Sequence, residues 1–238
     1  MIESLLPAAT QLVVALLAAA PTPAANFSAD ALASDLARAA PNADREVLGL
    51  AARALACVRA REPATSPKTL SVIDYSKPST ERRLWVFDLS LGTLLFEEWV
   101  AHGRNSGDNF AQRFSNDAGS LMSSVGLFVT QDTYTGHNGY SLRLRGLDAG
   151  FNDRALERAI VMHGADYVSE RVILGQGRLG RSFGCPAVRR EIAPALINTI
   201  RDGSLVFAYF PVTQWLNRSP FVGGCGSSAS APPVETSP

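Results

Sequence analysis

Three scarcities in this 238-residue sequence each exclude a class of protein. Neither charge is in excess, since 22 Lys and Arg balance 22 Asp and Glu, so the composition gives no electrostatic reason to expect nucleic acid as a partner. The apolar run Leu12–Ala20 has nine residues, whereas a bilayer-spanning helix needs roughly 20. The three histidines form no HxH or HExxH pair, so no metal and no cofactor is predicted.

The same apolar run has the length of a signal-peptide core, and the small residues Ala18, Ala20, Ala24 and Ala25 offer a cleavage site. We therefore expect residues 1–25 to be a targeting segment and the protein to be exported to the periplasm or cell envelope. One feature is atypical, because residues 1–11 contain Glu3 and no Lys or Arg. A short buried or interfacial helix is the alternative.

Cysteine is also rare, with only Cys57, Cys185 and Cys225. In an oxidising compartment two of them can pair and leave one free. Cys57 and Cys225 are the more plausible pair because they lie outside the segment that carries the chemistry. Three unpaired cysteines remain the alternative.

The chain divides by periodicity into a helical part and a strand-rich part. Residues 26–62 predict a helical hairpin interrupted at Pro41, with Ser28 or Asp30 capping the first helix and Asn42 or Asp44 the second. Residues 63–68 are linker-like in composition, and residues 216–238 are small and polar, which predicts a disordered tail.

Residues 69–215 are rich in β-branched and aromatic residues in short runs separated by turns. These runs predict a mainly β domain, a sandwich or partial barrel, with a few short helices. The predicted strands are 70–75, 84–89, 94–101, 126–133, 140–147, 159–163 and 204–210. The predicted helices are 153–158, 169–174 and 190–201, the last closed by Gly203.

The chemistry points to the segment 181–188, which reads RSFGCPAV. Gly184 leaves room for approach to the Cys185 sulfur, and loop amides near Ser182 can face a developing oxyanion. Arginines that lie nearby in the sequence are expected to lower the thiol pKa or to bind a substrate carboxylate. They are Arg178, Arg181, Arg189 and Arg190.

A histidine ends the apolar strand 159–163, and Gly164 follows it. His163 with Cys185 forms the smallest unit for nucleophilic acyl transfer, in which the imidazole takes the thiol proton and returns it to the leaving amine. The backbone carbonyl near Gly164 can orient the ring in place of a carboxylate. His102 also precedes a glycine and competes as the base, whereas His137 lies in a Gly/Asn turn and is expected to face solvent.

These motifs resemble the murein L,D-transpeptidase catalytic domain family over roughly residues 69–212. His163-Gly164 followed by Ser182-Phe183-Gly184-Cys185 matches the core pattern of HG and then S-x-G-C. The further matching motifs are Asp74–Ser79, Arg83–Val86, His102–Gly107, Phe114–Asn116, Tyr140–Leu144, Gly150–Asp153, His163–Glu170 and Gly180–Ala187.

The resemblance implies a cysteine enzyme that acts on peptidoglycan stem peptides. It implies that Cys185 attacks a stem tetrapeptide with release of D-alanine, that His163 is the base, and that Ser182, Gly184 and the Cys185 amide line the oxyanion site. A second stem then accepts the acyl group to give a 3→3 cross-link, and carbapenems are implied to acylate the cysteine. The predicted substrate contacts are His102, Asn105, Ser106, Gly164, Arg181, Phe183 and Arg189.

Two departures and two alternatives accompany this interpretation. Phe183 stands where many relatives have a second histidine, and Ala187 stands where Arg or Asn is common, so Arg181 or Arg189 would have to substitute. Water as acceptor would make the protein an L,D-carboxypeptidase. A non-catalytic murein-binding module, with residues 26–62 as a docking element, is the second alternative. The sequence does not decide the oligomeric state.

Overall fold

The computed structural model describes residues 28–62, 66–223 and 225. The expected targeting segment 1–25, part of the linker and residues 226–238 of the predicted tail lie outside the described residues. The elements in chain order are α1 (Ala29–Ala39), α2 (Arg45–Arg61), β1 (Thr69–Asp74), β2 (Leu84–Asp88), β3 (Thr93–Glu98), β4 (Gly126–Gly136), β5 (Gly139–Gly146), β6 (Val161–Ala165), α3 (Glu170–Gln176), β7 (Ala187–Arg189), α4 (Ala193–Ile200), β8 (Leu205–Tyr209) and α5 (Thr213–Arg218).

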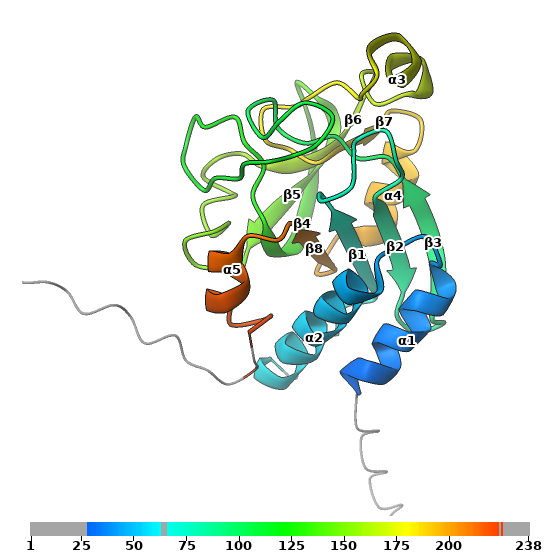
Figure 1. Ribbon diagram of the computed structural model, residues 1–238, viewed down its shortest axis with the longest axis vertical. Coiled ribbons are helices and arrows are strands. Elements are labelled where there is room, and N and C mark those ends of the chain that lie inside the picture. Colours follow the sequence, from blue (N-terminus) through cyan, green and yellow to red (C-terminus); the bar gives the residue numbers. More distant parts are fainter. Residues whose placement is uncertain (1–27, 63–65, 224, 226–238) are drawn as a thin grey trace, which may run out of the picture.

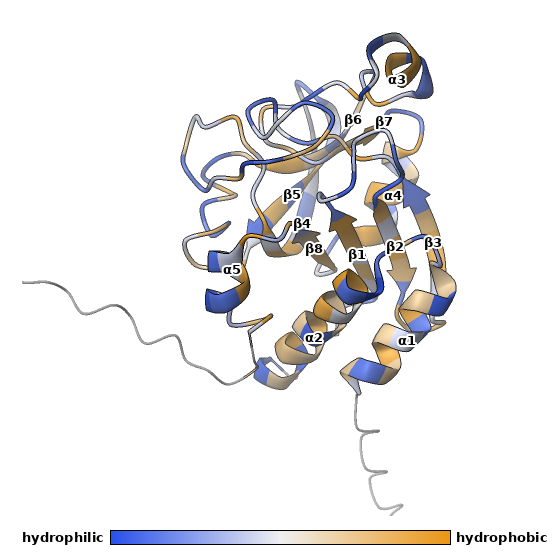
Figure 2. Ribbon diagram, viewed as in Figure 1, coloured by the Kyte–Doolittle hydropathy of each residue, from blue (hydrophilic) through white to orange (hydrophobic). Residues whose placement is uncertain are grey.

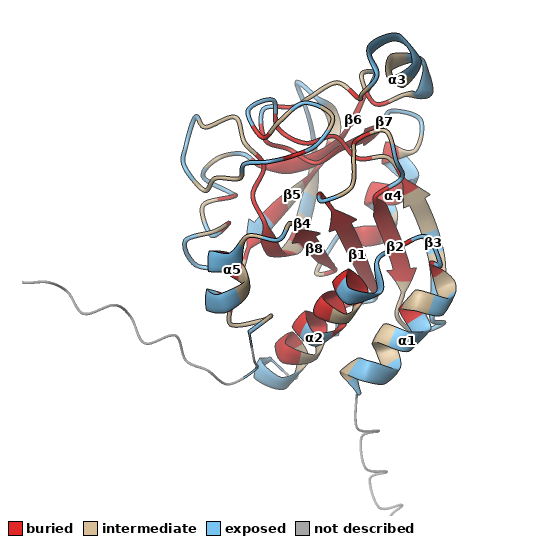
Figure 3. Ribbon diagram, viewed as in Figure 1, coloured by how far each residue is buried: buried red, intermediate tan, exposed pale blue. Residues whose placement is uncertain are grey.

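The two N-terminal helices begin where the sequence offers a side-chain cap. Ser28 Oγ accepts the N–H of Ala31 at 3.3 Å, and an Asp44 carboxylate oxygen accepts the N–H of Glu46 at 2.7 Å. Each cap satisfies an N–H that the first turn leaves without a partner. The two helices pack together beside the sheet, and α2 turns a mostly buried face toward it (Figures 1 and 3). The predicted hairpin is confirmed.

One eight-stranded sheet forms the body of the domain, in the order β3-β2-β1-β8-β4-β5-β6-β7. The pairs β1–β8 and β6–β7 are parallel, and the other neighbouring pairs are antiparallel. The two edges of the sheet approach each other, since the N–H of Ala101, just after β3, donates to Ala187 O in β7 at 2.8 Å. The sheet is therefore a nearly closed barrel, and the predicted mainly β class is confirmed.

Both faces of the central strands are buried, which explains why these strands are apolar throughout (Figures 2 and 3). Successive side chains of a strand point to opposite faces. In β2, Trp85 and Phe87 join the core shared with α1, α2 and α5, whereas Leu84 and Val86 join the core that contains α4. Two separate cores thus fix the register of the sheet, because a slip by one residue would exchange them.

The structure corrects three sequence predictions. Residues 153–158 form consecutive turns rather than a helix, and Ala159 then adopts a φ of 52°. The expected helix 190–201 begins only at Ala193, after the short strand β7, which the sequence did not suggest. The tail boundary predicted at residue 216 falls inside α5, whose Trp215 is fully buried.

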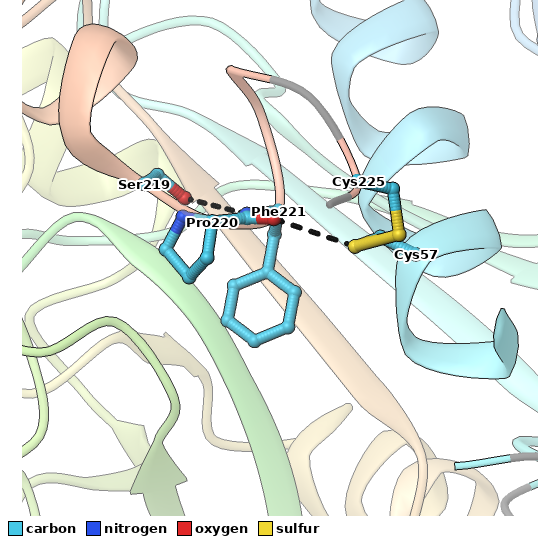
Figure 4. The surroundings of a disulfide bond; sticks show 5 residues. All are labelled: Cys57, Ser219, Pro220, Phe221 and Cys225. Atoms are coloured by element: carbon cyan, nitrogen blue, oxygen red, sulfur yellow. Dashed lines mark hydrogen bonds between the residues drawn. A yellow bond between two sulfur atoms is a disulfide. The ribbon is translucent and has the colours of Figure 1, made fainter. Parts of the chain in front are cut away.

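A disulfide joins Cys57 in α2 to Cys225, with the two Cα atoms 5.2 Å apart (Figure 4). Cys57 Sγ also lies 3.3 Å from the carbonyl oxygen of Pro220. Cys185 is the one free cysteine among the described residues. The sequence left open whether any cysteines pair. The structure has the bond between Cys57 and Cys225, which ties the segment after α5 to the N-terminal helices.

Candidate active site

The segment with Cys185 lies at the end of the domain that carries β6, β7 and α3, away from α1 and α2 (Figure 1). In the parallel pair of β6 and β7, His163 is in register with Ala187. Cys185 precedes Ala187 by two residues, so it enters the sheet level with Val161. The N–H of Val161 donates to the Cys185 sulfur at 3.5 Å. The turn that carries Cys185, just before β7, therefore lies beside β6, the strand that carries His163.

The Cys185 thiol is protonated in this arrangement. Its side chain is only 8% exposed, and the S–H donates to the carbonyl oxygen of Ala159 at 3.7 Å. Burial raises the thiol pKa above its ordinary value, while the Val161 N–H, the Arg158 guanidinium and the N–H of Cys185 itself lower it. Burial outweighs the other three, so the sulfur is a thiol that needs a base and not a preformed thiolate.

His163 is held in the tautomer that a base requires. Its Nδ1–H donates to the carbonyl oxygen of Gly164 at 3.1 Å, as the sequence suggested, and the lone pair of the neutral ring then lies on Nε2. Burial and then the charge of Arg190 lower the pKa of His163, against the opposing effect of the Gly164 carbonyl. The imidazole is therefore neutral and able to accept a proton at neutral pH. No hydrogen bond joins it to Cys185 within the part of the chain that is described.

His102 is excluded as the base by its contacts. It is fully buried, and Arg83 Nη2 donates to its Nδ1 at 2.8 Å, so its Nε2–H donates to Gly107 O at 3.3 Å. Both ring nitrogens are engaged. Burial, followed by the charge of Arg83, lowers the pKa of His102 to about 4. His102 therefore has no free ring nitrogen with which to act as a base, and His137 lies exposed in the β4–β5 turn.

The His102 pKa makes acid stability measurable. The unfolded ring has a pKa near 6.5 and the folded ring one of about 4, so between these values the unfolded chain binds the extra proton. Stability from this group is complete above pH 6.5 and is lost as the pH falls toward 4. We expect a loss of up to about 3 kcal/mol of unfolding free energy. Urea denaturation at pH 7 and pH 4.5 should show that His102→Gln loses less unfolding free energy between these pH values than the parent protein does. Equal losses in the two proteins would contradict a lowered pKa of His102.

A tight turn presents Cys185. The N–H of Gly184 donates to Ser182 Oγ at 3.1 Å, and Ser182 Oγ donates to the carbonyl oxygen of Cys185 at 2.6 Å. Gly184 has a φ of +123°, and a Cβ there would lie 2.8 Å from Met122 O. The expected oxyanion roles of Ser182 and Gly184 therefore do not match their contacts, because both groups hold the turn. The N–H of Cys185 is the loop amide beside the sulfur.

The second layer of the site comes from residues that the sequence did not single out. Ser123 Oγ accepts the N–H of Gly103 at 3.0 Å and donates to Gly184 O at 2.9 Å. Arg158 donates to Ser115 O at 2.7 Å and to Met122 O at 2.7 Å. It is the cation whose charge lowers the thiol pKa. No sequence motif predicts either residue, because each donates hydrogen bonds to backbone carbonyl groups that are distant in the sequence.

The four arginines expected near the thiol each face a carboxylate instead. Arg181 binds Asp108 at 2.6 Å, and Arg178 lies 4.0 Å from the same carboxylate. Arg189 in β7 donates from two nitrogens to buried Glu98 in β3, and this ion pair joins the two edges of the barrel. Arg190 pairs with Asp166. Their predicted effect on Cys185 is therefore wrong, since the paired carboxylates neutralise these charges.

The remaining predicted substrate contacts differ in accessibility. Phe183 lies in the turn that presents Cys185 and is 68% exposed, so a ligand can reach its ring. Asn105 is exposed and donates to Ser120 O, whereas Ser106 is buried and its Oγ accepts the N–H of Ser123. At Gly164 a Cβ would lie 2.8 Å from the Ala193 side chain, so this glycine serves packing against α4. Within the described ranges, no three side chains are grouped to hold a metal ion, and no helix is long and apolar enough to cross a bilayer.

Comparison with known proteins decides the family. The model of the L,D-transpeptidase catalytic domain matches residues 39–209, which is more than half of the chain. The chain belongs to this family. The L,D-transpeptidase match begins at the end of α1 and includes all of α2.

Solved structures of L,D-transpeptidases are similar to this domain at low identity. One from Mycobacterium smegmatis is 12% identical with a TM-score of 0.38, covering 60% of this chain and 59% of that chain. One from Mycobacterium tuberculosis H37Rv is 16% identical with a TM-score of 0.35, covering 61% and 59%. One from Stackebrandtia nassauensis is 14% identical with a TM-score of 0.36, covering 76% of each chain. This L,D-transpeptidase domain thus spans about three fifths of the first two. No curated protein matched the chain.

Proposed function

We propose that this chain is an exported peptidoglycan L,D-transpeptidase that forms a thioester on Cys185 and transfers the acyl group to the amine of a second stem peptide. The observation that carries the proposal is the pair of a buried thiol on the turn before β7 and a neutral His163 on β6, with Nδ1 fixed by Gly164. Family membership supports the substrate class.

The acylation step assigns one role to each group. When substrate binds, the thiol turns from the carbonyl oxygen of Ala159 toward His163, because catalytic hydrogen bonds often tighten only in the substrate complex. Nε2 of His163 takes the proton as the sulfur attacks the carbonyl carbon of the third stem residue. The N–H of Cys185 stabilises the oxyanion. The carbon–nitrogen bond then breaks, and His163 returns the proton to the amine of the departing D-alanine.

Deacylation reverses the proton transfers. The side-chain amine of a neighbouring stem attacks the thioester carbonyl, and its proton passes to His163. The carbon–sulfur bond breaks, and the sulfur recovers its proton from the imidazolium. Water in place of the amine would give a tripeptide, which is the carboxypeptidase alternative.

Export is supported by two features of different kinds. The disulfide between Cys57 and Cys225 is a bond that persists in oxidising compartments and is rare in the cytosol. The apolar run Leu12–Ala20, which lies outside the described residues, has the length of a signal-peptide core. Both features fit the periplasm or cell envelope, where peptidoglycan is accessible.

Incubation of the purified protein with disaccharide-tetrapeptide, followed by mass spectrometry, tests the proposed reaction. We expect a cross-linked dimer that has lost one D-alanine, and a transient protein adduct on the Cys185 peptide. Cys57 and Cys225 should carry no adduct, since they are joined to each other. Tripeptide as the only product would mean that water, and not an amine, accepts the acyl group. Unchanged substrate with no adduct would refute acyl transfer.

A further inference from the structure

A surface cavity of about 380 Å³ lies beside the turn that presents Cys185. It is formed by the loop 104–113 together with Arg181. Three arginines line it, namely Arg104, Arg113 and Arg181, along with one acid, Asp108, and the half-exposed ring of Phe110. Its lining is therefore cationic with one apolar wall.

The charges in this cavity are unequally compensated. Arg181 binds Asp108 at 2.6 Å, and Arg178 approaches the same carboxylate at 4.0 Å. Arg104 and Arg113 form no ion pair with any carboxylate of the described residues, although both line the cavity. A concave site of uncompensated guanidinium groups attracts anions and can bind a carboxylate with two parallel hydrogen bonds.

The loop that carries these arginines is held in a fixed conformation. The N–H of Arg113 donates to Ser106 O at 3.0 Å, and the Ser106 hydroxyl in turn accepts the N–H of Ser123. Gly107 permits the tight turn, because a Cβ there would lie 2.1 Å from Phe110 O. The arginine side chains therefore extend from an ordered base, which reduces the entropy lost when a ligand is bound.

The cavity is joined directly to the nucleophile turn. The N–H of Arg104 donates to Ser182 O at 2.8 Å, and Ser182 Oγ donates to the carbonyl oxygen of Cys185. The Arg104 guanidinium also lies over the exposed ring of Phe183, 5.7 Å from its centroid. A peptide whose scissile carbonyl reaches Cys185 can thus extend across Phe183 to Arg104.

We infer that Arg104 and Arg113 form a subsite for a carboxylate of the acyl-donor stem peptide. This inference rests on the proposed function, and it names Arg104 and Arg113 as residues that determine specificity for an anionic donor. Arg181, which the sequence favoured for this role, acts here as a structural partner of Asp108. The Phe110 and Phe183 rings contact the apolar part of the donor.

Binding is measured by titration calorimetry in the Cys185→Ala background of the full chain, so that no turnover interferes. The probes are disaccharide-tetrapeptide with free carboxylates and the same compound with its carboxylates converted to amides. Arg104→Gln and Arg113→Gln are each expected to raise the Kd of the free-carboxylate probe roughly tenfold. The amidated probe should bind the Cys185→Ala parent weakly, and neither arginine substitution should raise the Kd of this probe further.

Arg145→Gln provides the matched control, because Arg145 is an exposed arginine on β5 that lines a different cavity. Its Kd for both probes should equal that of the parent. Equal Kd values in the parent and in both cavity variants would overturn the inference, as would equal losses for the two probes or no measurable binding to the parent. D-alanine release by the unmodified protein tests the proposed function separately. Loss of the carboxylate subsite with D-alanine release intact would refute only this inference, and absence of D-alanine release would refute the proposed function.

Discussion

Replacing Cys185 by alanine is expected to abolish both D-alanine release and the covalent adduct. The sulfur is the atom that forms the thioester, and no second free thiol exists among the described residues. Removal of a nucleophile typically lowers kcat by about 10⁴-fold or more. Product formation is measured by mass spectrometry at matched protein concentration. Turnover by Cys185→Ala within about tenfold of the parent would refute the mechanism.

His163→Gln separates the base from the nucleophile. The amide leaves a side chain of similar reach without a titratable nitrogen, and loss of a general base costs about 10²- to 10⁴-fold in rate. The thiol should then react faster as the pH rises, because hydroxide replaces the imidazole. In the parent, the lowered pKa of His163 keeps the ring neutral, so activity should persist below pH 6.5 before it declines. An unchanged pH profile in His163→Gln would assign the base elsewhere.

Cys225→Ser serves as the control for cysteine substitution in Cys185→Ala. Cys225 is exposed and joined to Cys57, remote from the turn that carries Cys185. At a temperature where it is folded, this variant should release D-alanine at the parental rate. A loss of activity in Cys225→Ser under those conditions would show that cysteine substitution as such disturbs the domain.

The sequence predicted those structural elements that are determined by residues close together in the chain. Ser28 and Asp44 were each one of two cap candidates, because the oxygen that caps a helix lies two or three residues from the N–H it accepts. The apolar strands were identified because burial on both faces leaves a continuous hydrophobic run. The pair of Cys185 and His163 stays a prediction, made from a loop cysteine that follows a glycine, a histidine at a strand end that precedes one, and the resemblance to the family.

What the sequence missed depends on contacts between distant segments. Arg158 donates to Ser115 O, 43 residues away, and a donor to a backbone carbonyl leaves no signature in the residue type of its partner. Strand β7 has three residues, too few for a period to be visible. The arginines near Cys185 in the sequence were misjudged because their partners Glu98 and Asp108 come from β3 and from the loop 104–113.

The same lesson applies to the electrostatics of the thiol. Proximity in sequence suggested a cationic environment and a low pKa, whereas burial dominates and the pKa is raised. Charge near a cysteine lowers its pKa only where it is not neutralised by a closer carboxylate. In the proposed mechanism, the thiol therefore relies on His163 as a base at the moment of attack. This reliance is why the expected loss in His163→Gln is large.

Loss of the disulfide between Cys57 and Cys225 is expected to cause the largest change in stability. The bond closes a loop with a sequence separation of 168 residues, and on the chain-entropy model a crosslink of this length stabilises the fold by about 5 kcal/mol. Urea denaturation of Cys225→Ser should show a decrease of this order. Reductant should lower the stability of the parent toward that of Cys225→Ser and leave the variant unchanged.

Thiol counting decides whether the bond between Cys57 and Cys225 forms in the cell, as the proposed export requires. Protein recovered from the periplasm and unfolded without reductant should expose one reactive thiol, that of Cys185, and three after reduction. Three reactive thiols before reduction would mean that the bond does not form in the cell, and the argument for an oxidising compartment would fail with it. One reactive thiol before reduction, together with a urea-denaturation midpoint that falls when reductant is added, would instead mean that folding of the domain depends on export. A chain retained in a reducing compartment would not form the disulfide and would lack most of its stability.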